Sequence, residues 1–309
     1  MNCDQKVYCG VDVSKHYLDA FIDGRTVRFD NTALGARALA KRAGNVHYVF
    51  ESTGGYERMA AWQLLAAGCV ASIVNPGRVR EYAKSMGQLA KTDHIDARVI
   101  TEYAGAASPR PAELPSDEQR RLVVLVERRQ QLIDMQTAES NRLDTAGEDE
   151  LRKMIQQHLR WLGKQIDKLD EDIAQTIRDH GEMGEKAARI ESIKGLGKVC
   201  AATLLAYLPE IGTLSRQEIA ALAGLAPYNR DSGTFRGRRH VCGGRKRLRA
   251  CLYMAAVCAI QHNPQMKAFY TRLVVDNHRP KKVALTAVMR KLLIAANSAV
   301  KNPDFGVVV

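Results

Sequence analysis

The sequence predicts an α/β amino-terminal domain, a helical connector and a mainly α-helical carboxy-terminal domain. Three observations lead to this prediction. Short apolar runs alternate with helical patterns up to about residue 108. A heptad-like apolar seam crosses the middle of the chain, and the last third combines helical patterns with a strong excess of basic residues. The predicted domains span residues 1–108, 109–183 and 184–309.

The first domain begins with three short strands joined by tight turns at Ser14-Lys15 and Asp23-Gly24. A helix capped by Asn31 or Thr32 follows. We expect strands at 6–13, 17–23, 25–30, 46–51 and 69–74, and helices at 34–43, 55–67, from about 77, and over about 93–106. Three strands followed by alternating helices and strands is the order of an RNase H-like domain, in which a sheet of mixed strand directions holds acidic residues at its strand ends.

Four acidic residues stand out in this first domain. Asp12 and Glu51 each end an apolar run, and Asp93 and Asp96 lie three apart in a predicted helix, so that both face the same way. Carboxylates at the ends of buried strands repel one another unless a cation lies between them. Because an all-oxygen set suits Mg²⁺ or Mn²⁺, the four residues predict metal-dependent phosphoryl transfer on nucleic acid. A solvated surface carboxylate is the alternative for each of them.

The connector follows a linker marked by Pro109, Pro111 and Pro115. A long helical region begins near Asp117 and turns at residues 145–148. The second helix has an apolar seam made of Ile155, Leu159, Leu162, Ile166, Leu169, Ile173 and Ile177. This seam predicts an antiparallel helical hairpin or coiled coil that pairs with a second subunit; packing on its own domain is the alternative.

The charge of the chain is concentrated near its carboxy terminus. The formal net charge is +12, and residues 181–309 hold 21 Lys and Arg against eight Asp and Glu. Such a domain is suited to binding phosphates, although a solvated basic face is the alternative. No run approaches the roughly 18 apolar residues of a membrane span, and no signal peptide is visible. Seven cysteines without a Cys-x-x-Cys spacing favour a cytoplasmic protein over a disulfide framework or a zinc site.

The last domain contains a Gly-x-Gly turn at residues 195–197, between two helical patterns. Glycines at such a turn allow backbone N–H groups to approach a phosphate closely. The pattern predicts a helix-hairpin-helix element that binds the DNA backbone through Lys194, Gly195, Gly197 and Lys198. A simple tight turn is the alternative. Further helices are expected at about 248–261 and 281–298.

A basic, glycine-containing segment occupies residues 227–249. Eight Arg and Lys and one acid, Asp231, lie between Arg230 and Arg249, and Ser232 lies among them. A serine needs activation to act as a nucleophile, and guanidinium groups and a metal can stabilise the developing charge. The alternative is an ordinary turn serine. The nucleic-acid contacts predicted here are Arg230, Arg236, Arg238, Arg239, Arg245, Lys246, Arg247 and Arg249.

Four blocks of this sequence resemble the IS110/IS1111 transposases. They are Gly10-Val11-Asp12-Val13-Ser14-Lys15, Glu51-Ser52-Thr53-Gly54-Gly55-Tyr56-Glu57, Lys91-Thr92-Asp93-His94-Ile95-Asp96-Ala97, and Ala226-Pro227-Tyr228-Asn229-Arg230-Asp231-Ser232-Gly233 with its continuation through Gly243-Gly244-Arg245. The blocks occur in the family's order and the resemblance covers nearly the whole chain. The connector and the extreme termini have no such motif.

The resemblance implies a RuvC-like domain with an Asp-Glu-Asp-Asp tetrad, fused to a transposase domain with an essential serine. Members recombine DNA through a 5′-phosphoserine link, guided by a structured noncoding RNA that pairs with donor and target DNA. They form dimers that assemble into a tetramer with shared active sites. On this basis Asp12, Glu51, Asp93 and Asp96 would hold Mg²⁺, and Ser232 would attack the scissile phosphate.

Other functions remain open on the sequence alone. One is a RuvC-like metal-dependent endonuclease, such as a junction resolvase, in which Ser232 is a loop residue. Another is a non-catalytic nucleic-acid-binding protein that keeps an inactive fold, although an intact tetrad argues against it. A DNA invertase of the same family would share the chemistry and differ in outcome.

Overall fold

The computed structural model describes residues 7–88, 93–229, 237 and 239–302, without the side chains of residues 93–95. The chain divides at Pro115 into two compact units, each with its own core. The first unit is α/β and the second is almost entirely helical, which confirms the predicted α/β and helical classes.

A five-stranded sheet forms the centre of the first unit, in the order β3-β2-β1-β4-β5. Strand β2 runs antiparallel to β1 and β3, whereas β4 is parallel to β1 and β5, so the predicted mixed directions are confirmed. Asp23 and Gly24 both have positive φ, at 49° and 78°, and form the tight turn between β2 and β3. The strands are β1 Tyr8–Val13, β2 Tyr17–Ile22, β3 Arg25–Asp30, β4 His47–Glu51 and β5 Val70–Val74.

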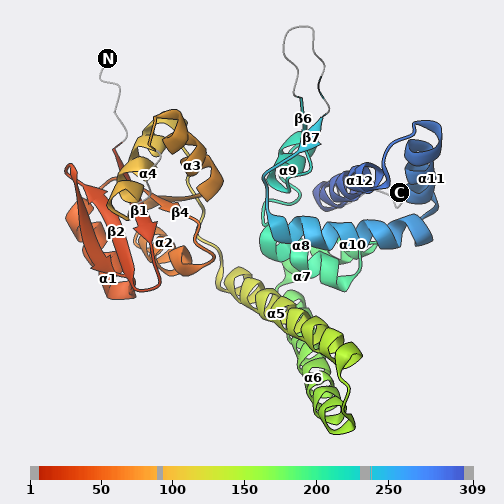
Figure 1. Cartoon of the computed structure of the whole chain (residues 1–309). Helices are drawn as coiled ribbons and strands as arrows, with labels where there is room; N and C mark the ends of the chain where they lie inside the picture. Colours follow the sequence, from red (N-terminus) through yellow and green to blue (C-terminus); the bar gives the residue numbers. More distant parts are fainter. Residues whose placement is uncertain (1–6, 89–92, 230–236, 238, 303–309) are drawn as a thin grey trace. The chain divides into compact units, whose positions relative to one another are not determined.

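Helices cover both faces of this sheet (Figure 1). Helices α1 (Ala33–Ala43) and α2 (Tyr56–Ala66) enclose one core with the side chains of β1 and β2 that point toward them. Helices α3 (Pro76–Ser85) and α4 (Asp93–Ala107) enclose a second core around Val49. The hydroxyl of Thr32 accepts the Gly35 N–H at 3.1 Å, so Thr32, one of the two predicted candidates, caps α1.

Helix α4 lies unusually close to β1 at Gly10. A Cβ at Gly10 would lie 2.4 Å from the carbonyl oxygen of Ala97 and 2.5 Å from the nitrogen of Thr101. The Gly10 N–H instead donates to the hydroxyl of Thr101 at 2.8 Å. Tyr8, two residues before Gly10 on the same face, packs against the apolar cluster to which α4 contributes Val99, Ile100, Tyr103 and Ala104.

The linker after α4 is fixed to the edge of the sheet. The Ala112 N–H donates to the Ala71 carbonyl, and the Ser72 hydroxyl donates to the Arg110 carbonyl, both at 2.7 Å. His47 is buried and its Nε2 lies 2.7 Å from the Ser72 oxygen. These bonds satisfy buried polar groups of strands β4 and β5 and cover part of the exposed edge of β5.

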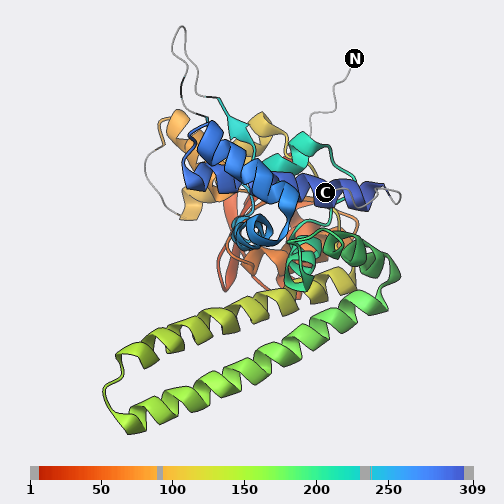
Figure 2. The same ribbon diagram turned by 90° about the vertical axis from the view of Figure 1, so that its right-hand side faces the viewer.

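Two long helices, α5 (Asp117–Thr145) and α6 (Asp149–Asp179), form the predicted antiparallel hairpin, which Figure 2 shows side by side. Leu132, Leu162 and Ile166 form a small core between them. Arg129 bonds Asp170 across the pair with two hydrogen bonds, of 2.6 and 3.1 Å.

The root of the hairpin belongs to the core of the second unit. Leu122 and Val126 of α5, with Ile173 and Ile177 of α6, pack in one cluster with the carboxy-terminal helices. The sequence analysis placed a domain boundary at residue 183, whereas the compact unit runs from Ser116 onward. The apolar seam of α6 is therefore buried within its own chain, and pairing with a second subunit stays a prediction.

The remaining helices enclose a large core made mostly of Leu, Ile, Val and Ala side chains. The elements of this region are α7 Gly181–Glu191, α8 Lys198–Tyr207, α9 Arg216–Leu222, β6 Pro227–Tyr228, β7 His240–Val241, α10 Lys246–His262, α11 Pro264–Thr271, the π-helix η1 Arg272–Asp276 and α12 Lys281–Lys301. The two last helices expected from the sequence thus correspond to α10 and α12.

Helix α12 is the central element of this core. By length and composition it is the one helix in the described ranges that could cross a membrane. However, 61% of its apolar window is buried inside the protein, and it packs against α7, α9, α10 and α11. Its apolar character is therefore explained by its place in the core.

The contact at Gly10 predicts a large effect of one methyl group. We expect Gly10→Ala to lower the free energy of unfolding of the first unit by about 3 kcal/mol, the upper end of typical overpacking costs, because both clashing atoms are backbone. Gly105→Ala on the same helix is the control, since a Cβ there meets nothing within 4 Å and should stabilise the unit by roughly 0.5–1 kcal/mol. Hydrogen exchange of β1 and α4 amides measures both; equal protection in the two variants would contradict the prediction.

Candidate functional site

Asp12 and Glu51 lie side by side at the carboxyl ends of neighbouring parallel strands. Val11 of β1 pairs with Phe50 of β4, so the next residues in register are Asp12 and Glu51. Both are partly buried. Because residues in register point to the same face, the two carboxylates share the face that α4 covers.

Helix α4 brings Asp96 to the same region. Ala97 is the residue that contacts Gly10, two positions before Asp12 on β1, and Asp96 directly precedes it in the first turn of α4. Asp93 is the first residue of α4, and its side chain lies outside the described part of the structure. The structure therefore places Asp12, Glu51 and Asp96 at one end of one face of the sheet.

The chemistry of these donors fits a hard divalent cation, because all are carboxylates. Among the side chains that the structure describes, no three His, Cys, Asp or Glu lie close enough together to hold a metal ion. The fourth acid, Asp93, lies outside that set. A cation bound among carboxylates offsets their mutual repulsion and would draw them together.

Glu57 fixes the loop that follows Glu51. Its carboxylate is buried and accepts four hydrogen bonds, from the Ser52 hydroxyl, from the N–H and hydroxyl of Thr53, and from the Gly55 N–H, at 2.8–3.2 Å. Two of these partners are backbone N–H groups, which can only donate, and both bond the same carboxylate oxygen, Oε2. The motif from Glu51 to Glu57 is thus a closed loop with the carboxylate of Glu57 at its centre.

Asn31 joins this loop to the one that follows Asp12. Its side-chain Nδ2 donates to the Ser14 carbonyl at 2.9 Å and to the Tyr56 carbonyl at 3.1 Å. Ser14 lies just past β1, and Tyr56 begins α2 after the loop that follows β4. The local sequence predicts Asn31 only as a candidate helix cap, and it contains no pattern that indicates this bridge between two loops.

A further carboxylate, Asp19, lies directly opposite Asp12 on β2. Asp19 is buried, and Arg28, directly opposite it on β3, donates to both of its oxygens at 2.8 Å. Sequence analysis missed this pair. The signal that could have found it is the hairpin register, since the pairing of Val13 with Leu18 fixes that of Asp12 with Asp19.

The predicted helix-hairpin-helix segment is a turn between α7 and α8. Its Gly195 has φ +109° and faces α10, where a Cβ would lie 2.6 Å from the Cβ of Ala259. The buried Asn263 donates to the Lys194 carbonyl at 3.1 Å. Packing rather than phosphate approach therefore explains Gly195. Gly197, Lys198 and the Lys194 side chain are exposed.

The basic segment that includes Ser232 emerges from a tightly built stem. Strands β6 and β7 pair Tyr228 with His240. Behind them Gly224 touches Gly243 and Gly244 backbone to backbone: a Cβ at Gly224 would lie 2.2 Å from the Gly243 oxygen, and one at Gly244 would lie 2.1 Å from the Gly224 nitrogen. The close contact therefore requires glycine at 224 and 244, and Arg249 supports it by donating to the Gly243 carbonyl.

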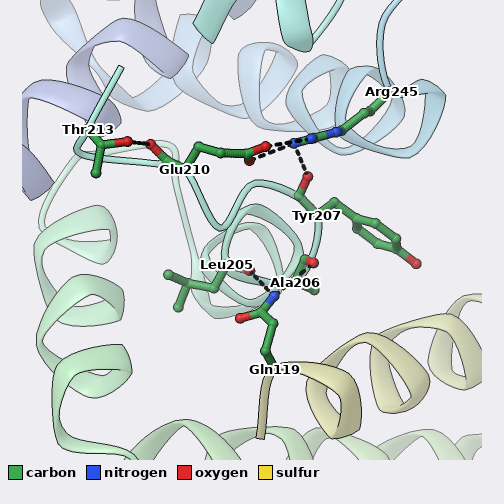
Figure 3. Close-up of polar contacts among 7 residues, drawn as sticks. All are labelled: Gln119, Leu205, Ala206, Tyr207, Glu210, Thr213 and Arg245. Carbon is green, nitrogen blue, oxygen red and sulfur yellow. Dashed lines mark hydrogen bonds and ion pairs between the residues drawn. The ribbon is translucent and has the colours of Figure 1, made fainter. Parts of the chain in front are cut away.

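Arg245 ties this stem to the end of α8 (Figure 3). Its guanidinium group bonds both oxygens of Glu210, at 2.8 and 2.9 Å, and donates to the Tyr207 carbonyl at 2.7 Å. On the other side of the same helix end, Gln119 of α5 donates to the carbonyls of Leu205 and Ala206. These donors stabilise carbonyls and a carboxylate of its own chain, and the contact of Arg245 with a phosphate stays a prediction.

Arg247 is similarly engaged. It donates to the Tyr207 hydroxyl and lies 3.3 Å from Glu127 of α5. Burial, and then the neighbouring Glu127 carboxylate, raises the pKa of Tyr207 to about 12, so its hydroxyl stays protonated and donates to Glu127 at 3.3 Å. Arg247 therefore also joins the hairpin root to the start of α10.

Other predicted contacts remain exposed. Arg239 and Lys246 flank the stem, and Lys194 and Lys198 flank the α7–α8 turn. Arg249 is partly buried against the stem. Four of the predicted residues lie outside the described part of the structure: Arg230, Ser232, Arg236 and Arg238. Their distances to the four acids are therefore not described either.

Two family models match the chain in sequence order. A transposase model of the IS110 DEDD type matches residues 9–146, which include all four acids. A model described as the transposase IS116/IS110/IS902 family matches residues 187–271, which include Ser232 and its stem.

Individual relatives agree with these matches. The chain is 30% identical to the pilin gene-inverting protein of Moraxella bovis and 29% identical to that of Moraxella lacunata, in each case over 96% of both chains. It is also 31% identical to the insertion element IS900 uncharacterized 42 kDa protein of Mycobacterium paratuberculosis, over 42% of this chain and 34% of that protein. Taken with the acids on an α/β sheet and the two model matches, these similarities show that the chain belongs to the IS110 family of transposases, which are DNA-processing enzymes.

Proposed function

We propose that this protein is a site-specific DNA recombinase that cuts and rejoins strands through a phosphoserine intermediate. The observation that supports this most strongly is the common position of Asp12, Glu51 and Asp96 on the face where α4 meets β1. Membership of the IS110 family supports an activity of the transposase class, and Ser232 in the basic segment could serve as the nucleophile.

The acidic residues Asp12, Glu51, Asp93 and Asp96 would hold Mg²⁺ or Mn²⁺. When bound, the metal supplies charge stabilisation for the oxygens of the transferred phosphoryl group. The protein's own part is to keep the carboxylates in place: the loop around Glu57 positions Glu51, and the contact at Gly10 positions Asp96 relative to Asp12. These supports lie on strands and helices rather than on free loops, as a precise site requires.

In the proposed reaction the Ser232 hydroxyl oxygen forms a bond to the phosphorus of a DNA linkage. The bond from phosphorus to the 3′ oxygen breaks, the serine loses its proton, and the departing oxygen becomes a 3′-hydroxyl. The energy of the phosphodiester is kept in the new ester, so a different 3′-hydroxyl can reverse the step and join the strands without another energy source. Hydrolysis by a plain endonuclease would lose this energy.

The nucleic acids are the remaining partners in this proposal. We propose donor and target DNA, a structured guide RNA and a homodimer that assembles into a tetramer. Four exposed basic side chains are suited to contacts with phosphates: Lys194, Lys198, Arg239 and Lys246. Contacts with phosphates hold the nucleic acid without reading its sequence. The guide RNA would choose the sites by base pairing, and the protein would recognise that RNA by its shape and backbone.

Inversion of a DNA segment is a second candidate outcome. It is favoured by two relatives named pilin gene-inverting proteins, each aligned over 96% of this chain. Inversion and transposition use the same strand chemistry and differ in the arrangement of the sites. A plasmid with two sites in opposite orientation, assayed beside one with sites on separate molecules, distinguishes the outcomes.

A suicide substrate tests the proposed chemistry. A nick placed beside the scissile linkage lets a short fragment diffuse away, which traps a covalent intermediate. We expect DNA attached to protein, with the bond mapped by peptide mass spectrometry to residue 232. Free ends without an adduct would instead support hydrolysis by a RuvC-like endonuclease.

Ser232→Ala should abolish the covalent adduct and leave DNA binding unchanged, because it removes one oxygen and no charge. Ser192→Ala is the matched control; this exposed serine bonds only its own helix, at the Arg189 carbonyl, and the variant should form the adduct normally. Adduct yield on the suicide substrate and a parallel binding titration provide the measurements. A normal adduct from the Ser232 variant would refute the assignment.

Asp96→Asn should reduce the rate of strand cleavage by more than the roughly 10–100-fold typical of an outer-shell partner, since it removes a charge from a direct metal ligand. Glu102→Gln, on the same helix but paired with Arg98 at 2.7 Å, is the control and should remain active. Single-turnover cleavage at saturating Mg²⁺ measures both. Similar rates for the two variants would exclude Asp96 from the metal site.

Arg239→Gln should weaken DNA binding and reduce the slope of log affinity against log salt by about 0.9, the value for one lost phosphate contact. The control removes both charges of an internal pair, Glu210→Gln with Arg245→Gln, and should leave the slope unchanged. Titrations of duplex DNA at several salt concentrations measure these slopes. An unaltered slope for Arg239→Gln would place this side chain away from phosphate.

A further inference from the structure

A row of charged side chains crosses the sheet at the level of the acidic site. Strand pairing sets Arg28 opposite Asp19 and Asp19 opposite Asp12, and Glu51 follows in register on the other side of Asp12. Paired residues point to the same face, so the row runs Arg28, Asp19, Asp12, Glu51 across four strands. Only the last two belong to the proposed metal site.

Asp19 stands closer to Asp12 than an unrelated surface acid would. Directly opposed residues of antiparallel strands have Cβ atoms about 4.5–5.5 Å apart. The Asp19 side chain is only 8% exposed, whereas that of Arg28 is 50% exposed. A carboxylate that is both buried and this close to Asp12 would repel it, and it would also be a fifth oxygen donor within reach of a cation.

Arg28 is placed to prevent both effects. Its Nε and Nη2 donate to the two oxygens of Asp19 at 2.8 Å each, a bidentate arrangement that occupies the carboxylate from one side. The guanidinium group also stacks on the ring of Tyr17, at 4.8 Å from its centre, which fixes its position on the far side of Asp19 from Asp12.

We propose that Asp19 and Arg28 are a positioning pair for the metal site: Arg28 is the internal counterion that keeps Asp19 from drawing the cation away from Asp12, Glu51 and Asp96. This inference rests on the proposed metal-dependent function. It assigns neither residue a contact with substrate. Within the pair, Arg28 offsets the negative charge of Asp19 beside Asp12. The pair thereby determines how tightly the site binds the cation and where the cation lies.

The pair gives a prediction that a purely structural role would not. Arg28→Gln unmasks the charge of Asp19, so Mn²⁺ should bind about tenfold more tightly, while strand cleavage slows because the ion is shared with Asp19. Asp19→Asn leaves the Arg28 cation without its anion, two strands from Asp12, so Mn²⁺ should bind about tenfold more weakly. The double variant removes both charges and should restore affinity to within about threefold of the wild type.

The experiment is a Mn²⁺ titration of the full-length protein without nucleic acid. The electron paramagnetic resonance signal of the free ion measures how much Mn²⁺ remains unbound at each step. Arg28→Lys, which keeps the charge, should bind as the wild type does. An exposed ion pair supplies the control: Asp23, at the turn between β2 and β3, and Arg42 of α1 lie 2.9 Å apart. Asp23→Asn and Arg42→Gln make the same charge changes and should leave affinity unchanged. Circular dichroism confirms that each variant is folded.

The outcomes separate the two levels of the proposal. If the Asp96→Asn variant binds Mn²⁺ as tightly as the wild-type protein does, the proposed metal site itself is wrong. If Asp96→Asn weakens binding but the two single variants shift affinity in the same direction, the pair is only a structural ion pair and this inference is overturned. Opposite shifts that cancel in the double variant support it.

Discussion

The proposed metal site depends on the close approach of α4 to β1 at Gly10. With no side chain between them, the helix and the strand contact through backbone atoms and the Thr101 hydroxyl, and this fixes both the height and the rotation of the helix over the sheet. Asp96 is one residue from that contact on the helix, and Asp12 is two residues from it on the strand. A larger residue at position 10 would lift the first turn of α4, and the acids of strand and helix would separate. The arrangement of carboxylates is therefore a consequence of a single packing constraint.

Around that constraint the first unit adds supports of different kinds. Buried Glu57 collects the donors of the loop after Glu51, and Asn31 bonds the loops that follow both strands. The Asp19–Arg28 pair lies on the neighbouring strands. None of these groups needs to touch substrate, yet each restricts where Asp12 or Glu51 can lie. Acidic sites are costly to assemble because their members repel, so the surrounding polar contacts supply the order that the acids cannot supply themselves.

Much of this could be predicted from the sequence, because local patterns determine it. The strands and helices of the first unit, the mixed sheet, the linker prolines and the α5–α6 hairpin follow from periodicity, turn residues and breakers. The acids at strand ends followed from the same patterns. What could not be predicted depends on contacts between distant segments. Gly195 packs against Ala259, Gly224 and Gly244 meet backbone to backbone in the stem, and Arg245 bonds Glu210. The root of the hairpin joins the core of the second unit because Ile173 and Ile177 meet helices that lie far away in sequence.

The glycine contact at the base of the basic segment has a consequence for how this family can diversify. Gly224 and Gly244 fix the two ends of the segment at one separation, independently of the residues that lie between Tyr228 and His240. Closing a loop costs entropy that grows only slowly with its length, so once the ends are joined, insertions and exchanges between them change the cost little. A stem closed in this way is suited to hold intervening stretches of different sequence and length. Exchanging residues 229–239 between homologues would therefore leave the backbone contact of Gly224 and Gly244 in place.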